Sequence, residues 1–250
     1  MQKTFTDNLI KNSAVIAISN KISLLQRKIF NFLIAQAYAN LEKEESYQID
    51  LKHLVSIIGF NSKNIAYLKE SLKQLMTTVV EFNLLGKDKT SWSATTLLSS
   101  VSFSEGKCVY SFSPVLRKKL HQPNIYAKIK LSMMKLFSSK YALCLYEIFI
   151  DYNNIGQTPV IALDDFRKLM GIKAHQYTAF KRLSLSVIKP ALEELSRIGG
   201  YKVEVQYQRE HRKVVALKFY FKAIATKRPQ TLTQQTIPHQ ALQQRLMKEF

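Results

Sequence analysis

Apolar and polar positions follow two separate series along the chain, and each series predicts the same order of elements. The segments Tyr47–Phe60 and Pro159–Ile172 carry apolar residues at matching positions, at a constant offset of 112 residues. In both segments, apolar residues three and four positions apart predict a short helix, followed by a glycine (Gly59 and Gly171). A glycine at this place is typical of a helix that ends in a left-handed residue.

A longer helix is expected after each glycine. The first covers about residues 62–78 and the second about residues 175–196, each with an apolar stripe at helical spacing. Pro190 lies inside the second pattern, so we expect that helix to kink or to split in two. One further helix precedes each copy, at about residues 24–39 and 133–152.

Pairs of strands with alternating apolar residues follow the long helices. They are expected at residues 90–102 and 107–112 in the first copy, and at residues 201–207 and 214–221 in the second. Each copy therefore has the order helix, short strand, helix, helix, β-hairpin, which is the winged form of the helix-turn-helix. We predict an α+β protein with two tandem winged-helix domains related by an internal repeat. The alternative is an unrelated α+β domain with a chance match.

The predicted domain boundaries follow breaks in this pattern. Residues His121–Asn124 interrupt both periodicities, so the first domain is expected at residues 1–122 and the second at residues 123–222. The remainder, residues 223–250, is rich in glutamine and lacks a core-building pattern. We expect a flexible tail there, and a docking peptide for a partner is the alternative.

The composition adds a strong charge signal. The chain has 37 Lys and Arg against 18 Asp and Glu, a formal net charge of +19, spread over both predicted domains. So large an excess indicates a polyanionic partner, either a nucleic acid or an anionic membrane. No apolar stretch is long enough for a membrane span, and no single helix concentrates the charge, so double-stranded DNA is favoured over a membrane. Two cysteines without a disulfide framework indicate a cytoplasmic protein.

Candidate DNA-binding residues of the second domain lie on its second long helix and at its hairpin tip. A helix-turn-helix inserts its second helix into the major groove, where Gln can contact adenine and Arg can contact guanine. The predicted contacts are Lys173, His175, Gln176, Thr178, Lys181 and Arg182 from the helix, and Arg209, Arg212 and Lys213 from the tip. An ordinary solvated helix face is the alternative for Lys181 and Arg182, and a charged soluble turn is the alternative for the tip.

The first domain offers a less basic set of candidates: Lys63, Asn64, Lys69 and Lys73 on its second long helix. This set contains no arginine, so we expect it to contact phosphates more than bases. The hairpin tip Ser104–Lys107 is nearly neutral. We expect the sheet that carries it to serve protein association instead of DNA binding.

Several stretches of the chain, in their order and spacing, resemble the plasmid replication initiators that bind iterons, which are short direct repeats at an origin. These stretches are Lys21–Phe30, Ala66–Leu72, Phe112–Leu116, Leu136–Glu147, Leu163–Gly171, Tyr177–Arg182 and Val187–Glu194. The resemblance covers about residues 8–222, and Ser138–Glu147 is its most diagnostic part. The tail lies outside the resemblance, and residues 179–185 hold less arginine than many relatives do.

The resemblance implies a cytoplasmic bacterial protein with tandem winged helices that binds iterons as a monomer. It also implies a homodimer, formed through the first winged helix, that represses its own promoter at an inverted repeat. Opening of an A·T-rich segment and recruitment of the host initiator and the replicative helicase are implied as well. In the family the recognition helix of the second domain makes the main base contacts, which correspond here to Lys181 and Arg182.

The residue patterns of common DNA-processing enzymes do not occur in the sequence. It has no His-x-His pair, no His-x-x-Arg element and no Gly-x-x-x-x-Gly-Lys-Ser/Thr loop, and two cysteines cannot build a four-ligand zinc site. We therefore predict no enzymatic activity, no metal and no cofactor. The competing functions are a tandem winged-helix transcriptional repressor without an initiator role, and an RNA-binding or scaffold protein held by its basic surface.

Overall fold

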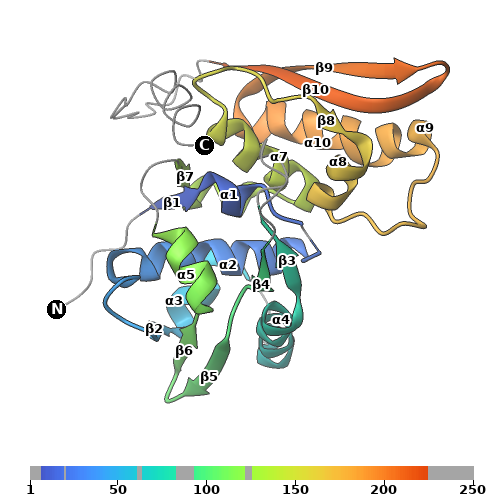
Figure 1. Cartoon of the computed structure of the whole chain (residues 1–250). Coiled ribbons are helices and arrows are strands. Elements are labelled where there is room, and N and C mark those ends of the chain that lie inside the picture. The colour runs from blue at the N-terminus through green and yellow to red at the C-terminus, as the bar shows by residue number, and fades with distance from the viewer. Residues whose placement is uncertain (1–6, 20, 61–63, 83–92, 122–125, 225–250) are drawn as a thin grey trace, which may run out of the picture.

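The computed structural model of the chain describes residues 7–19, 21–60, 64–82, 93–121 and 126–224, and contains two winged helices, as predicted (Figure 1). The helices are α1 (Ser13–Ile16), α2 (Leu24–Ala37), α3 (Leu51–Ile58), α4 (Ile65–Thr77), α5 (Pro114–Leu120), α6 (Leu131–Leu136), α7 (Lys140–Asp151), α8 (Leu163–Met170), α9 (Phe180–Leu183) and α10 (Lys189–Glu194). The strands are β1 (Asn8–Asn12), β2 (Tyr47–Asp50), β3 (Val79–Glu81), β4 (Ala94–Thr96), β5 (Ser100–Ser104), β6 (Lys107–Ser111), β7 (Tyr126–Lys130), β8 (Ile161–Ala162), β9 (Tyr201–Glu210) and β10 (Lys213–Ala223).

The first winged helix is built around α2, whose side chains are buried on nearly all sides. Ser23 and Gln26 form a capping box at its start, because each side chain bonds the backbone amide of the other residue. The helices α3 and α4 pack against α2, and the antiparallel sheet has the order β2-β6-β5. The β5–β6 hairpin turns at Glu105 (φ 50°) and Gly106 (φ 72°), a left-handed pair that suits the twist of a two-residue turn.

The strand predicted over residues 90–102 forms two short strands in the part of this range that the structure describes. β4 pairs with β3, a strand that the sequence pattern did not predict, and β5 pairs with β6. Between β4 and β5, Leu97 and Leu98 are both fully buried, and both backbone amides donate to the carbonyl of Leu75. Both amides thus bond to α4 instead of to a neighbouring strand, which interrupts the sheet, and the chain bends between β4 and β5.

The helix predicted over residues 133–152 forms two helices, α6 and α7. Phe137 is buried in the break between them, and the Ser139 hydroxyl caps the N-terminus of α7. The carboxylate of Glu194, which is also buried, accepts hydrogen bonds from the backbone amides of Ser138 and Ser139 at 2.7 and 3.0 Å. A distant part of the chain therefore supplies the partners that start α7, and local periodicity does not contain that information.

Helix α7 lies between the two winged helices (Figure 1). It packs on α1, α2 and β7 on the side of the first winged helix, and on α8 and α10 on the side of the second. β7 follows the predicted boundary between residues 122 and 123, and it pairs with β1 near the start of the chain, with Asn8 opposite Lys130. The packing of the first winged helix thus extends to β7 and one side of α7.

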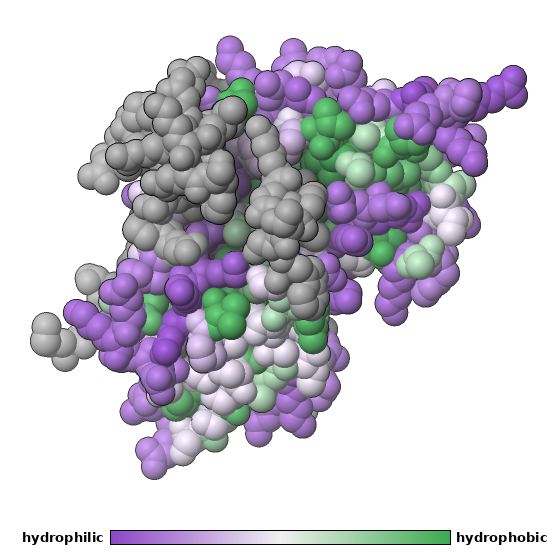
Figure 2. Space-filling model, in the orientation of Figure 1, coloured by the Kyte–Doolittle hydropathy of each residue, from purple (hydrophilic) through white to green (hydrophobic). Residues whose placement is uncertain are grey.

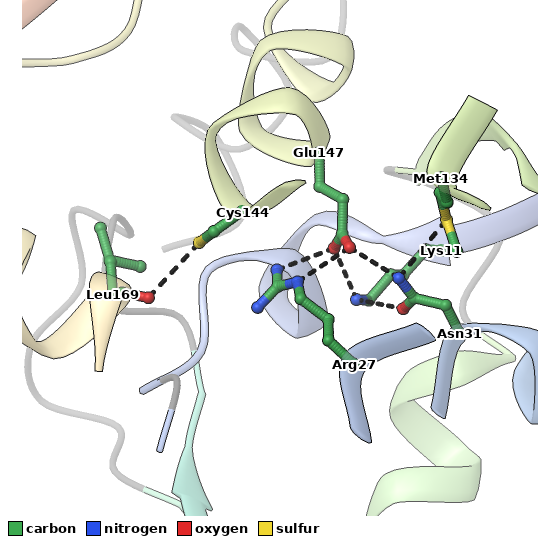
Figure 3. Close-up of polar contacts among 7 residues, drawn as sticks. All are labelled: Lys11, Arg27, Asn31, Met134, Cys144, Glu147 and Leu169. Carbon is green, nitrogen blue, oxygen red and sulfur yellow. Dashed lines mark hydrogen bonds and ion pairs between the residues drawn. The ribbon is translucent and has the colours of Figure 1, made fainter. Parts of the chain in front are cut away.

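A buried ion cluster fixes α7 on the first winged helix (Figure 3). Glu147 of α7 accepts from Lys11 of β1 at 2.8 Å, from Arg27 of α2 at 2.9 and 2.8 Å, and from Asn31 of α2 at 2.6 Å. None of these four side chains is more than 1% exposed. Burial raises the pKa of Glu147, but Arg27 and Lys11 together lower it to about 2. The carboxylate of Glu147 is therefore ionised at neutral pH.

The second winged helix repeats the first over its opening elements. α8 begins and ends 112 residues after α3, and Gly59 (φ 67°) and Gly171 (φ 61°) are both left-handed caps, as predicted. The amide after each glycine bonds back to a carbonyl five residues earlier, which closes a Schellman motif in both copies. The offset then grows, because α4 begins at Ile65 and α9 begins 115 residues later at Phe180. The turn between the two helices is therefore longer in the second copy.

The second long helix continues from Phe180 to Gly199 and includes two π-helical turns, Ser184–Ile188 and Leu195–Gly199. Pro190 modifies this helix without ending it, because a π turn directly precedes α10 and Pro190 lies in the first turn of α10. Proline lacks a backbone amide and its ring needs room in the preceding turn, and the wider π turn provides that room. The sheet that follows has the order β8-β10-β9.

The described residues contain no helix that is long and apolar enough to cross a membrane. Cys108 and Cys144 are buried free thiols. Within the same ranges, no group of three His, Cys, Asp or Glu side chains is placed to hold a metal ion.

Candidate nucleic-acid interface

The recognition helix of the second winged helix begins at Phe180, five residues later than predicted. His175, Gln176 and Thr178 are exposed in the turn that joins α8 to α9, so the prediction that they are helical is wrong. Tyr177 accounts for the late start, because its φ of 50° is incompatible with a right-handed helix. These side chains still lie directly before the first turn of the recognition helix.

Gln176 closes this turn on itself. Its backbone amide donates to the carbonyl of Lys173 at 2.9 Å, and its side-chain oxygen accepts from the backbone amide of Lys173 at 3.3 Å. A bidentate contact with adenine uses the same side-chain oxygen as an acceptor. Gln176 must therefore share or release this bond if it contacts a base.

The exposed face of the recognition helix carries more residues than the sequence analysis named. Lys181 and Arg182 are exposed on the first turn, Leu183 is buried, and Phe180 packs edge-on against Tyr207 at 5.1 Å. The following turns expose Leu185, Ser186, Lys189 and Pro190. They follow Lys181 and Arg182 by four or eight positions, a helical spacing that was available in the sequence and could have identified them.

A groove lies between this helix and the wing formed by β9 and β10. Five of its lining residues are cations and none is acidic. The helix contributes Lys181 and Lys189, the wing contributes Arg209, Arg212 and Lys213, and the other lining residues are Leu163, Thr178, Phe180, Ser184, Leu185 and Val214. Side chains separated by some thirty positions thus meet in one basic surface, and the predicted residues Lys173, His175, Gln176 and Arg182 lie outside its lining.

The wing is longer and its turn is tighter than predicted. β9 extends to Glu210 and β10 starts at Lys213, so only His211 and Arg212 form the turn, with His211 in the left-handed region (φ 53°). The Arg209 guanidinium donates to the carbonyl of Arg212 at 3.4 Å. The hydrophilic tip projects from the body of the molecule above α9 at the upper right of Figure 2. The hairpin therefore presents its cations away from the core.

The corresponding residues of the first winged helix have different surroundings. Lys63 lies outside the described residues, and the Asn64 side chain caps α4 by accepting from the backbone amide of Tyr67 at 3.1 Å. Lys69 is exposed with its ammonium 5.8 Å from the centre of the Phe103 ring, and Lys73 is exposed on the next turn. Two lysines thus remain on an exposed face of α4, where they can meet phosphates.

The arrangement of the elements defines the class of tandem winged-helix proteins. A sequence model of the family described as "Initiator Replication protein, WH1" matches residues 8–150, and a second described as "Initiator Rep protein, WH2" matches residues 162–221. The chain belongs to this family of replication initiator proteins.

Two similar proteins illustrate the family. A curated replication initiation protein of Escherichia coli is 27% identical over 172 residues, which cover 65% of this chain and 52% of that protein. The match therefore spans about half the length of that relative. Among solved structures, the Pi initiator protein in complex with iteron DNA aligns with a TM-score of 0.66 and 17% identity, over 88% of this chain and 98% of that chain. The second similarity shows that the two chains share a fold.

Proposed function

We propose that this protein is a plasmid replication initiator that binds iterons as duplex DNA. The observation that carries this proposal is the groove between the recognition helix and the wing, where five cations converge without an acidic residue. A recognition helix in the major groove leaves an adjacent wing beside the phosphates, and this arrangement of cations fits both contacts. Membership of the initiator family and the fold shared with an iteron-bound initiator support iterons as the DNA.

The second winged helix is the proposed reader of the DNA sequence. Lys181 and Arg182 would contact base edges, and the turn would add Lys173, His175, Gln176 and Thr178. Arg209, Arg212 and Lys213 of the wing would contact phosphates. In the first winged helix, Lys63, Asn64, Lys69 and Lys73 would contact the backbone, which gives affinity and orientation without sequence information.

The first winged helix is also the proposed site of dimerisation. β5 is the last strand of the sheet β2-β6-β5, and within the described residues its outer side pairs with no other strand. Its sequence, Ser100–Ser104, has no charged side chain that would protect the edge. A homodimer formed there would bind an inverted repeat at the promoter and repress transcription, and the monomer in equilibrium with it would bind iterons.

Origin opening requires partners. The sequence has no phosphate-binding loop, so the chain has no recognisable means of using ATP to unwind DNA. We propose that the protein, bound at several iterons in the cytoplasm, opens an adjacent A·T-rich segment and recruits the host initiator and the replicative helicase.

A hydroxyl-radical footprint of the full chain on the DNA that flanks its own gene tests this function. We expect protection of several evenly spaced direct repeats, together with competition by the same duplex and not by RNA. Protection of a single inverted repeat and nothing else would identify a dedicated repressor with the same fold. Equal competition by RNA of unrelated sequence would contradict duplex recognition.

A further inference from the structure

Arg167 reaches from α8, the first helix of the second helix-turn-helix, into the turn that precedes the recognition helix. Its guanidinium donates to three consecutive carbonyls: to Gln176 at 3.0 Å through Nη1, and to Tyr177 and Thr178 at 2.5 and 3.4 Å through Nη2. Arginine is suited to this task, because its planar group presents several donors in a fixed geometry. One side chain thus holds the backbone of three residues together.

The middle residue of the three, Tyr177, has an unusual backbone. Its φ of 50° is rare for a bulky residue and persists only where the surroundings hold it from several sides. Arg167 holds its carbonyl, and its half-buried side chain lies beside that of Tyr141 on α7. The conformation of the turn is therefore set from two neighbouring helices.

We propose that Arg167 is a positioning residue for DNA recognition, which holds the turn from Lys173 to Ala179 in its binding shape without contacting DNA itself. This inference rests on the proposed function. The turn exposes Lys173, His175, Gln176 and Thr178, all of which are candidate DNA contacts. A loop that is already ordered loses less conformational entropy when it binds, so its order contributes to affinity.

Two of these three contacts contribute little to the stability of the fold. The bonds from Arg167 to Gln176 and Thr178 are exposed to solvent, so water can replace the guanidinium at these carbonyls. Lys168 provides a matched control. It follows Arg167 on α8, carries the same charge and is exposed. Replacing Lys168 removes one positive charge near the turn, and the donors of Arg167 stay in place.

The experiment compares the full-length wild type with Arg167→Ala, Arg167→Lys and Lys168→Ala. The first measurement is ¹⁵N relaxation in the absence of DNA. We expect the order parameters of the backbone amides in residues 173–179 to fall in both Arg167 variants and to stay unchanged in Lys168→Ala. The lysine variant keeps the charge, but a single ammonium cannot serve three carbonyls in fixed geometry. All four proteins should unfold at similar temperatures.

The second measurement is the affinity for the footprinted duplex and for a scrambled duplex of the same length. Both affinities are measured at the same salt concentration. In both Arg167 variants, affinity for the specific duplex should fall about tenfold and affinity for the scrambled duplex should fall much less, because the turn contributes to base recognition. Lys168→Ala should change both affinities by the same factor.

Three results would overturn the inference: wild-type order in both Arg167 variants, wild-type specific affinity in Arg167→Ala, or full recovery of order and affinity in Arg167→Lys. The last result would show that charge alone matters. If Arg167→Ala does not fold, the lysine variant carries the test by itself. A wild type that does not distinguish the two duplexes would contradict the proposed function, whereas the relaxation measurement still reports on the turn.

Discussion

The two winged helices begin alike and differ in what they expose. α3 and α8 end in the same glycine cap, but the helix that follows exposes two lysines and no arginine in the first copy, and both lysine and arginine in the second. The hairpin tips differ too, with Glu105 and Gly106 at the first turn and His211 and Arg212 at the second. One fold thus appears twice in the chain, and the side chains at the second helix and the wing decide which copy suits sequence recognition.

A second difference concerns how the copies are anchored. The recognition turn of the second copy depends on Arg167, whereas the face of α7 that meets the first copy depends on the ion cluster around Glu147. The first contact lies near solvent and the second is fully buried. We therefore expect changes at the buried cluster to affect the whole molecule and changes at the basic surface to affect DNA binding alone.

The largest effect is expected from Glu147→Gln. The variant keeps the shape of the side chain but leaves the buried cations Lys11 and Arg27 without their counter-ion, which should lower the free energy of unfolding by about 3–5 kcal/mol. Urea denaturation measures this change. Glu193→Gln on the exposed face of α10 is the matched control and should be neutral. A loss of less than about 1 kcal/mol in Glu147→Gln would show that the cluster does not hold the junction.

Arg182→Ala comes next and addresses sequence recognition. Removing a base contact should weaken binding to the specific duplex by about 1–3 kcal/mol and weaken binding to scrambled DNA far less. Fluorescence anisotropy with both duplexes measures the difference. Arg197→Ala removes an exposed arginine from the far end of the same helix and serves as the control. Equal losses on both duplexes would place Arg182 on the backbone.

The junction also predicts a dependence on pH. Burial raises the pKa of Asp151 to about 6, and the Ser13 hydroxyl opposes this shift only in part by donating to the carboxylate. Between the unfolded value near 4 and about 6, the folded state binds more protons, so stability increases as the pH falls through this window. The destabilisation at pH 7 should be about 3 kcal/mol, because each unit of pKa shift corresponds to about 1.4 kcal/mol. Asp151→Asn should remove it.

Denaturation midpoints of the wild type and Asp151→Asn at pH 7.5 and 5 check this sign. The advantage of the variant should be largest at pH 7.5 and smaller at pH 5. An advantage that grows as the pH falls would contradict the raised pKa. Glu147 contributes the opposite dependence, and only in stronger acid, because its stabilisation is lost as the pH falls from about 4 through about 2.

Arg212→Ala should have a smaller and less selective effect. Loss of one phosphate contact at the wing tip should weaken binding to every duplex and reduce the slope of log affinity against log salt by about 1. Titrations at several salt concentrations measure the slope. Lys222→Ala, at the other end of β10, should leave it unchanged. An unchanged slope in Arg212→Ala would place the wing off the DNA.

The smallest effect is expected from deletion of residues 229–250. This segment lies outside the described residues, and no candidate DNA contact falls within it. Affinity for the footprinted duplex should be unchanged in the truncated protein. A large loss would make the tail part of the DNA site.

Much of the fold could be predicted because its signals are local. Apolar spacing identified α2, α3 and α8, and the two glycines identified the C-caps of α3 and α8. The division of residues 133–152 and the start of α9 could not be predicted in this way, because each depends on a distant side chain. Glu194 supplies partners at the start of α7, and Arg167 with Tyr141 holds Tyr177 in a left-handed conformation. The boundary between residues 122 and 123 stays a prediction.

The candidate site could be predicted only where its signals are local in the sequence. A run of cations marks Lys181, Arg182 and the wing in the sequence, and helical spacing could have added Lys189. The groove itself follows only from the folding of β9 and β10 onto the helix. Gln176 shows the limit of a prediction from residue type, since its side chain is bonded within its own turn.

We propose that the second winged helix recognises the DNA sequence and that the first contributes general affinity. Two matched double variants of the full chain test it, Lys181→Ala with Arg182→Ala and Lys69→Ala with Lys73→Ala, because each removes two positive charges. Their affinities for the footprinted and scrambled duplexes should be measured at one salt concentration. We expect the first pair to collapse the ratio of the two affinities and the second pair to lower both affinities by the same factor. A collapse of the ratio in the Lys69 and Lys73 variant, with the ratio preserved in the other, would contradict it.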